Sequence, residues 1–225
     1  MDAEKITINL SEEERKLILG NNSLADIQGF MRCMQQYRAG IKEIRTKLEI
    51  LDEEFKTLYD YNPIHHIESR LKSPKSIMGK LKKKELPFNE FAIRKNITDI
   101  AGIRVICNYI DDVNNISKLL CRQTDVKLLK KSNYITNPKE SGYRSLHLVV
   151  EVPVFLAEKT VPTPVEVQIR TIAMDFWASL EHKLKYKTDA DVSDELRERL
   201  KICAEEIAKL DLEMQQIHEE IKEKN

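Results

Sequence analysis

One segment of this chain is strongly basic, although the charges of the whole chain balance. Lys plus Arg and Asp plus Glu number 37 each in the 225 residues, yet no acid occurs at positions 69–84. A helix predicted from Ser76 places Ser76, Lys80 and Lys83 on one face, where they could bind a polyphosphate near a helix N-terminus. A solvated basic surface explains such a run equally simply. The basic residues are Arg70, Lys72, Lys75, Lys80, Lys82, Lys83 and Lys84.

A carboxylate stands at the mouth of a predicted strand. Asp99 is followed by Ile-Ala-Gly-Ile and then Arg104, which leads into the apolar stretch that ends at Cys107. Mg²⁺ prefers one or two carboxylates together with phosphate oxygens, so Asp99 is a candidate metal ligand. The alternative interpretation is that Asp99 only caps a turn.

An aromatic residue follows a glycine in the segment that begins at Gly142. The glycine frees the backbone, so that Tyr143 can project its ring as a stacking platform for a base. Ser145 and His147 are predicted to point to one side of the strand that follows. Packing is the more common role of a tyrosine beside a turn, so both interpretations stay open.

A second carboxylate lies on a strand with period-two alternation. Val165, Val167 and Ile169 would be buried, and Glu166, Gln168 and Arg170 would share the opposite face. A carboxylate on that face could bind a metal or accept a proton from an attacking hydroxyl. The polar face of a half-exposed strand is the plainer alternative.

The elements that would position these side chains can be predicted in outline. Apolar residues recur at gaps of three and four from Ile27 to Leu58 and again from Leu196 to Ile221, which predicts two long helices with heptad seams. Ser193 or Asp194 would cap the second helix. Each seam could pack within the molecule or against another subunit, and the sequence does not choose between them.

The middle of the chain alternates between strands and helices. A helix capped by Asp111 or Asp112 should follow the first strand, and a last helix should bury Met174, Trp177 and Leu180. Pro162 and Pro164 are expected to bracket a loop. The predicted strands are 103–107, 125–130, about 145–150 and 165–170, and the last helix is 171–184. The fold class is therefore α/β (α+β), a mixed sheet with helices, flanked by the two long helices.

We predict one structural unit in three parts: an extension and long helix at 1–62, a central domain at 63–190 and a C-terminal helix at 191–225. No apolar run reaches the length of a membrane span, and the acidic N-terminus does not resemble a signal peptide. The four cysteines lack the spacing of a zinc site or a disulfide framework. They are expected to be buried free thiols in the cytoplasm.

In their order and spacing, these segments resemble the synthetase domain of the RelA/SpoT homologue family, and within it the small alarmone synthetases. The resemblance covers about 63–187. The segments that carry it are Arg70-Leu-Lys72 with Ser76, Ile77 and Lys80, then Asp99-Ile-Ala-Gly-Ile-Arg104, Gly142-Tyr-Arg-Ser-Leu-His147, Glu166-Val-Gln-Ile-Arg-Thr171 and Phe176-Trp-Ala-Ser-Leu-Glu-His182.

The resemblance implies a nucleotidyltransferase-like sheet and the synthesis of (p)ppGpp. Such an enzyme transfers the β,γ-pyrophosphate of ATP to the 3′-hydroxyl of GDP or GTP, with GMP as a further acceptor, and releases AMP. It implies Mg²⁺ as cofactor, a cytoplasmic location and a homo-oligomer, with a tetramer favoured.

The resemblance also implies roles for individual residues. At the ATP site, Arg70 and Arg104 would sandwich adenine, and Lys72, Ser76, Lys80 and Lys83 would surround the phosphates. Asp99 would bind the metal, and Glu166 would deprotonate the acceptor hydroxyl and could also contact the metal. Tyr143 would stack on guanine, His147 would lie near the acceptor phosphates, and Arg144 and Gln168 would complete the acceptor site.

Two departures and two alternatives accompany the resemblance. There is no His-Asp doublet, so no hydrolase activity is expected, and Asp175 stands where the subgroup leads us to expect asparagine. An acid there would oppose binding of a phosphate-rich effector. One alternative keeps the chemistry but uses adenosine nucleotides or the tRNA 3′ end as acceptor. The other is a catalytically silent protein that binds single-stranded RNA or a partner.

Overall fold

A single mixed sheet forms the centre of the molecule. The computed structural model describes residues 20, 22–187 and 193–224. Within these ranges the strands are β1 (Ile64–Leu71), β2 (Ala101–Cys107), β3 (Lys127–Asn133), β4 (Leu146–Phe155) and β5 (Thr160–Thr171), in the order β1-β2-β5-β4-β3. β2 and β5 run parallel, and the other neighbouring pairs are antiparallel. The predicted α/β (α+β) class is confirmed.

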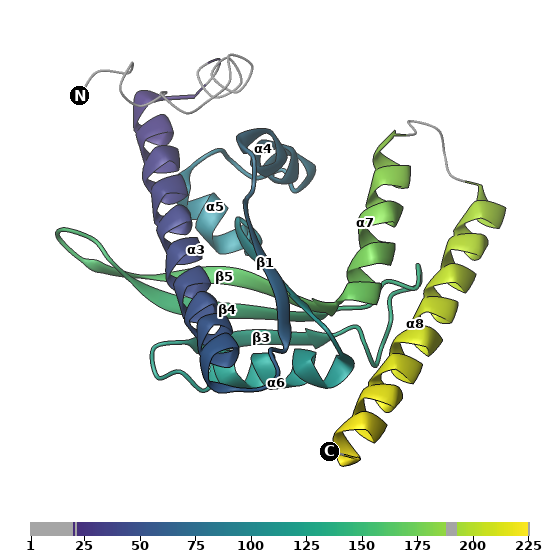
Figure 1. Cartoon of the computed structure of the whole chain (residues 1–225). Helices are drawn as coiled ribbons and strands as arrows, with labels where there is room; N and C mark the ends of the chain where they lie inside the picture. The colour runs from purple at the N-terminus through teal and green to yellow at the C-terminus, as the bar shows by residue number, and fades with distance from the viewer. Residues whose placement is uncertain (1–19, 21, 188–192, 225) are drawn as a thin grey trace.

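Helices pack against the sheet and at one end of it (Figure 1). The long helix α3 crosses the sheet, whereas α7 and α8 lie side by side beyond the end of β5. The described helices are α3 (Leu24–Leu58), α4 (Pro74–Lys83), α5 (Glu90–Asn96), α6 (Ile110–Cys121), α7 (Ile172–Lys187) and α8 (Asp194–Glu223). The division at residues 62 and 190 stays a prediction.

The core lies between α3 and the apolar face of the sheet. Phe30, Tyr37 and Ile44 of α3 are buried, as are Val105 of β2 and Val167 of β5. The first heptad seam therefore packs within the molecule. The α8 seam differs, because its apolar residues Leu196, Leu210, Met214, Ile217 and Ile221 are exposed.

Helix caps agree with the predictions in part. Ser193 caps α8 as expected, but α4 begins at Pro74 behind an N-cap at Ser73 rather than at Ser76. The predicted cap of α6 by Asp111 or Asp112 is wrong. Tyr109 is the N-cap, and Asp112 lies at the third helical position, from which its carboxylate accepts the backbone N–H of Tyr109.

The loop predicted around Pro162 and Pro164 is also wrong, because both prolines lie inside β5. β2 pairs with β5 only at Glu166–Thr171, so the first half of β5 has β4 as its single neighbour among the described strands. A proline is tolerated there because an edge does not need its missing N–H.

Other elements differ from the sequence expectation in extent. β1 and α5 were not predicted, and β3 is Lys127–Asn133 rather than 125–130. Leu180 is 43% exposed, although Met174 and Trp177 are buried as expected. Cys33 and Cys107 are buried free thiols, whereas Cys203 is an exposed one.

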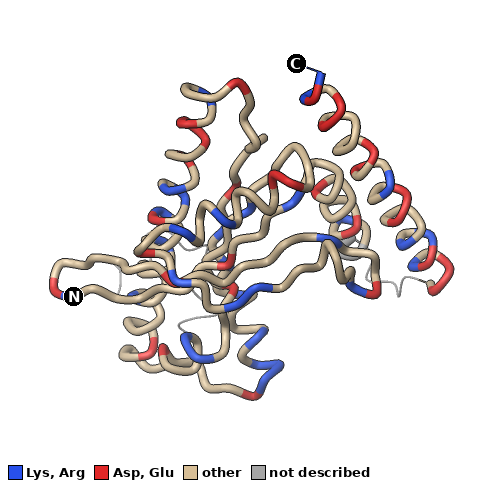
Figure 2. The backbone as a smooth tube through the Cα atoms, turned by 90° about the horizontal axis from the view of Figure 1, so that it is seen from below, with Lys and Arg blue, Asp and Glu red and all other residues tan. Residues whose placement is uncertain are grey.

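Figure 2 shows acidic and basic residues interleaved along α8, in agreement with the equal totals of the two signs. Among the described helices, none combines the length and apolarity that crossing a bilayer requires.

Candidate active site

The register of the sheet brings polar residues from four strands into two neighbouring rows. One row is Glu68 (β1), Arg104 (β2), Gln168 (β5) and His147 (β4), and the other runs from Arg70 through Gly102 to Glu166. Since side chains alternate along a strand, all of these residues share one face. The opposite face meets α3, where Arg45 donates to the Ser69 hydroxyl at 3.1 Å.

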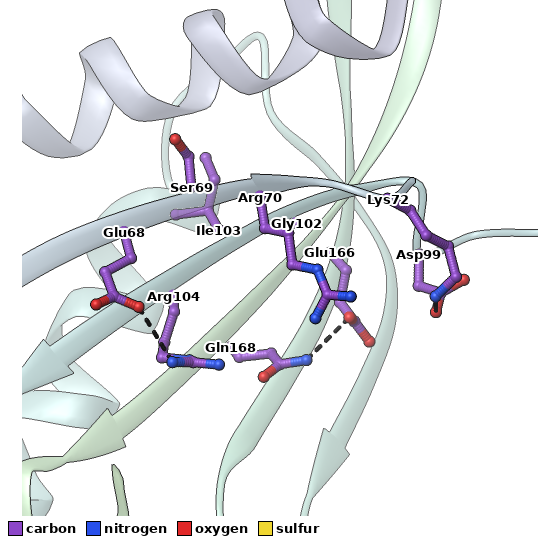
Figure 3. A pocket seen from close by; sticks show the side chains of 10 residues that line it. All are labelled: Glu68, Ser69, Arg70, Lys72, Asp99, Gly102, Ile103, Arg104, Glu166 and Gln168. Carbon is purple, nitrogen blue, oxygen red and sulfur yellow. Dashed lines mark hydrogen bonds and ion pairs between the residues drawn. The ribbon is translucent and has the colours of Figure 1, made fainter. Parts of the chain in front are cut away.

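A cavity of about 200 Å³ opens on the polar face. In Figure 3 the side chains of Arg70, Arg104, Glu166 and Gln168 point to the side of the sheet away from Ser69. The residues that line the cavity are Glu68, Ser69, Arg70, Lys72, Asp99, Gly102, Ile103, Arg104, Glu166 and Gln168. Six of the sequence-predicted site residues therefore meet in one place.

Asp99 lies between two cationic side chains. Its Oδ2 accepts from Nζ of Lys72 at 2.8 Å and from Nζ of Lys80 at 2.5 Å. Burial on its own would raise the pKa of Asp99, but the hydrogen bonds and charges of the two lysines outweigh it and lower that pKa below its usual value. Asp99 is consequently ionised at neutral pH and holds both ammonium groups beside the cavity.

Glu166 is the second carboxylate of the cavity. It accepts from Nε2 of Gln168 at 3.0 Å, and Nδ1 of His147 lies 3.5 Å from its Oε1. Burial would raise the pKa of Glu166, but the contacts with His147 and Gln168 outweigh burial and lower it, while the charge of Asp99 acts in the opposite direction. An ionised carboxylate that faces a cavity can accept a proton from a bound hydroxyl.

Tyr143 is held by hydrogen bonds at its hydroxyl. The hydroxyl lies 2.8 Å from Nε2 of His147 and accepts from Nη2 of Arg170 at 2.6 Å. Gly142 precedes it at φ 86°, in the left-handed region that favours glycine, and so turns the chain into position for the ring. The glycine signal in the sequence is therefore confirmed as a backbone requirement.

Six of the predicted site residues are not part of the cavity lining; Lys80, His147 and Tyr143 are described above, and the other three and Ser145 lie elsewhere. Ser76 contacts the hydroxyl of Ser73 at the start of α4, and Lys83 ends the same helix. Arg144 donates to the backbone carbonyl of Ile135 at 2.7 Å. Ser145 is buried, and its hydroxyl donates to the carbonyl of Ile169 at 3.2 Å. The binding roles of Ser76, Lys83 and Arg144 stay predictions.

The structure adds side chains that sequence reasoning missed. Nζ of Lys139 lies 4.8 Å from the centroid of the Tyr143 ring, and Tyr134 meets the His147 ring edge-on. Glu68 accepts from Arg104 at 3.1 Å. Asp175 was noted only as a departure from the resemblance, yet it pairs with Arg170 and Arg104 at 3.0 and 3.5 Å. Glu68 is two residues from Arg70 on β1 and Lys139 is four residues before Tyr143, but the contacts of Glu68 and Asp175 with Arg104 join segments that are distant in the sequence.

Two carboxylates of the cavity could contribute ligands to a divalent cation that takes the rest of its coordination from a substrate. Within the described ranges, no three His, Cys, Asp or Glu side chains form a ready metal site. Asp99 and Glu166 line one cavity, and the charge of Asp99 acts on the pKa of Glu166. Mg²⁺ commonly uses one or two carboxylates and phosphate oxygens, which is the donor set that this cavity and a nucleotide would supply together.

Comparisons with known proteins match this chain to one family. A family model described as a region found in RelA / SpoT proteins matches residues 69–191. The chain is 42% identical to GTP pyrophosphokinase YwaC of Bacillus subtilis (strain 168) over 185 residues, 82% of this chain and 88% of that protein. It is 35% identical to GTP pyrophosphokinase YjbM of the same organism over 202 residues, 88% of this chain and 92% of that protein.

Solved structures resemble most of this chain. Small alarmone synthetase 1 from Bacillus subtilis, bound to its product pppGpp, matches with a TM-score of 0.79 at 34% identity, over 85% of this chain and 97% of that one. Small alarmone synthetase 2 from the same organism matches with a TM-score of 0.76 at 42% identity, over 83% and 96%.

Proposed function

The chain belongs to the RelA/SpoT protein family, and on that premise we propose that it is a (p)ppGpp synthetase. It transfers the β,γ-pyrophosphate group of ATP to the 3′-hydroxyl of GDP or GTP and releases AMP. GMP is a further acceptor to be tested. The observation that carries this proposal is the convergence of Arg70, Arg104, Asp99 and Glu166 on one cavity, in a chain with two relatives, YwaC and YjbM, that are named GTP pyrophosphokinases.

The cations of the cavity suit the donor nucleotide. Arg70 and Arg104 lie on neighbouring strands of the polar face, and flat guanidinium groups can stack on an adenine ring. Lys72 and Lys80 are already gathered by Asp99. Their charges neutralise the phosphates and stabilise the negative charge that spreads during transfer.

Glu166 is assigned as the general base that accepts the proton of the acceptor 3′-hydroxyl. The 3′-oxygen forms a bond to the β-phosphorus of ATP, the bond between that phosphorus and the bridging oxygen to the α-phosphate breaks, and AMP leaves. The proton of the hydroxyl passes to a carboxylate oxygen of Glu166. His147 and Gln168 fix that carboxylate, so its reorganisation contributes little to the barrier.

We assign Mg²⁺ as the cofactor, held by Asp99 and Glu166 together with substrate phosphates. When bound, the ion supplies charge neutralisation and fixes the phosphates. Tyr143 is assigned to stack on the acceptor base, with His147, Gln168 and Arg144 in the acceptor site. Since ATP and guanosine nucleotides are the substrates, we place the reaction in the cytoplasm.

The exposed seam of α8 supports a homo-oligomer, and we favour a tetramer. Leu210 and Met214 of α8 and Ile172 and Phe176 of α7 line an apolar cavity of about 530 Å³. All four side chains are more than two-fifths exposed in the single chain. A second copy that covered this surface would remove it from water. Light scattering measures the molar mass in solution of wild type and of Leu210→Glu. The variant should have the smaller mass, and equal masses would contradict an interface at this surface.

One incubation tests the activity. Purified protein is incubated with Mg²⁺ and ATP, and each reaction contains one candidate acceptor: GTP, GDP, GMP or uncharged tRNA. One further reaction contains ATP alone, so that ATP is the only possible acceptor. The products are separated by anion-exchange chromatography. AMP that forms in step with a guanosine tetra- or pentaphosphate is expected. AMP with a modified adenosine nucleotide or tRNA would change the acceptor. No AMP, with tight binding of single-stranded RNA, would replace the enzyme by a binding protein.

A further inference from the structure

One carboxylate oxygen lies between two guanidinium groups from neighbouring strands. Oδ1 of Asp175, in the first turn of α7, is 3.0 Å from Nη1 of Arg170 and 3.5 Å from Nη1 of Arg104. Arg170 is only 5% exposed. Two guanidinium groups held this close in a partly buried place repel each other, and an acid between them offsets that repulsion.

The two arginines lead to different parts of the site. Arg104 lines the cavity assigned to ATP. Arg170 donates from Nη2 to the hydroxyl of Tyr143 at 2.6 Å and to Oε1 of Gln168 at 2.8 Å. A contiguous chain of polar contacts therefore runs from the ATP cavity through Asp175 to the aromatic platform.

The backbone of the fold and a contact with Ser179 fix the position of Asp175. β5 ends at Thr171 and α7 begins at Ile172, so Arg170 and Asp175 lie on one uninterrupted segment. The second carboxylate oxygen of Asp175 accepts from the hydroxyl of Ser179 at 3.4 Å, one helical turn further on. A charged acceptor so placed sets the direction of both guanidinium groups.

We propose that Asp175 is a positioning residue that couples the two nucleotide subsites. ATP that stacks on Arg104 fixes the guanidinium group of Arg104. This group holds Asp175, and Asp175 in turn holds Arg170. Arg170 then keeps the Tyr143 ring in the orientation that the acceptor base needs. Bound ATP therefore tightens acceptor binding, and by linkage the acceptor tightens ATP binding by the same factor. This inference rests on the proposed function.

The coupling factor is measured by calorimetry, without turnover. The probes are GDP and an ATP analogue in which a methylene group replaces the oxygen between the α- and β-phosphates, so transfer cannot occur. The Kd of GDP is measured without the analogue and with a saturating amount. In wild type we expect the analogue to lower the Kd of GDP at least about fivefold, the lower end of common coupling factors.

Asp175→Asn keeps the size and one oxygen of the side chain and removes the charge. In this variant the ratio of the two Kd values should fall below about twofold. The matched control is Glu90→Gln, because Glu90 also pairs with two arginines, Arg94 at 2.8 Å and Arg32 at 3.8 Å, away from the cavity lining. The control should keep the wild-type ratio.

Tyr143→Phe interrupts the same chain at its other end and leaves Asp175 in place, so it too should lose coupling. It keeps the inference testable if Asp175→Asn does not fold. A wild-type ratio near one would overturn the coupling. The coupling through Asp175 would also be refuted if folded Asp175→Asn or Tyr143→Phe kept the wild-type ratio of the two Kd values of GDP. It would likewise be refuted if Glu90→Gln lowered this ratio as much as Asp175→Asn does. Failure of wild type to release AMP from ATP would instead refute the proposed function.

Discussion

Replacing Gly142 by alanine should push the backbone that precedes Tyr143 away from α8, because the new Cβ would clash with that helix. A Cβ at position 142 would lie 2.6 Å from Cβ of Ala204 and 3.5 Å from Cα of Lys201, both on α8. Ala204 is 3% exposed, so it has little room to move. The backbone at φ 86° adds strain of its own, because an L side chain rarely adopts that conformation.

The two effects have separable magnitudes. Left-handed strain costs about 1–2 kcal/mol, and forcing an extra methyl group into a packed contact costs about 1–3 kcal/mol. Gly142→Ala should therefore lower the free energy of unfolding by about 2–5 kcal/mol. Ala204→Gly alone should cost about 2 kcal/mol, from helix propensity and the lost buried methyl group.

The double variant identifies the steric part. With Ala204→Gly present, the new methyl group occupies the space that the old one left, so only the backbone strain of Gly142→Ala remains. The double variant should then be about 1–3 kcal/mol more stable than the sum of the single effects predicts. Urea denaturation measures all four proteins. A coupling energy below about 0.5 kcal/mol would refute the contact as the cause.

Enzyme kinetics provide an independent check of the same change. Since Tyr143 follows Gly142, Gly142→Ala should raise the KM of the acceptor more than that of ATP, and the double variant should recover part of the loss. An increase confined to the KM of ATP would mean that the platform belongs to the other nucleotide.

Three further outcomes are expected. Glu166→Gln keeps the size of the side chain but cannot take a proton, so kcat should fall by about 10²–10⁴-fold in steady-state assays; a value within tenfold of wild type would remove Glu166 from the role of base. Tyr143→Phe keeps the ring but loses the hydroxyl that meets His147 and Arg170, so the acceptor KM should rise less than in Tyr143→Ala; equal increases would argue against stacking. Asp211 is buried with the Thr171 hydroxyl as its donor, and burial, only partly offset by this bond, raises the pKa of Asp211. The pKa of Asp211 is therefore higher in the folded protein than in the unfolded chain. At neutral pH the buried charge of Asp211 lowers the free energy of unfolding of wild type. Asp211→Asn should raise Tm at pH 7 and lose this advantage below about pH 4, where both states are protonated; thermal melts in which the advantage grew on acidification would contradict this assignment.

Local patterns located the carboxylate strand well. Period-two alternation placed Val165, Val167 and Ile169 in the core and set Glu166 and Gln168 on the cavity side, as the structure has them. This succeeds because the direction of a side chain from a strand depends only on its parity. The heptad seam of α3 was predictable for a similar reason, since one continuous stripe packs on the sheet.

Long-range pairing was not predictable in the same way. β1 has a mostly polar edge sequence, and only Ile64 of its eight residues is buried, so no alternation reveals it. Its register with β2, which sets Arg70 opposite Gly102, depends on contacts about thirty residues apart in the chain. The contacts of Asp175 with Arg104 likewise exist only once α7 has packed beside β2. The resemblance of motifs assigned Arg70 and Arg104 to one site, which local patterns could not do, but it supplied neither β1 nor the contact of Asp175 with Arg104.

The direct passage from β5 into α7 has a consequence for how such chains can change length. Glu166, Gln168, Arg170 and Asp175 lie on one stretch with no loop to absorb an added or lost residue. A single deletion before Arg170 would turn the preceding side chains to the other face of the sheet, and one after it would rotate Asp175 about 100° around its helix. We expect natural insertions and deletions to avoid this stretch and to collect at 156–159, the tip of the β4–β5 hairpin.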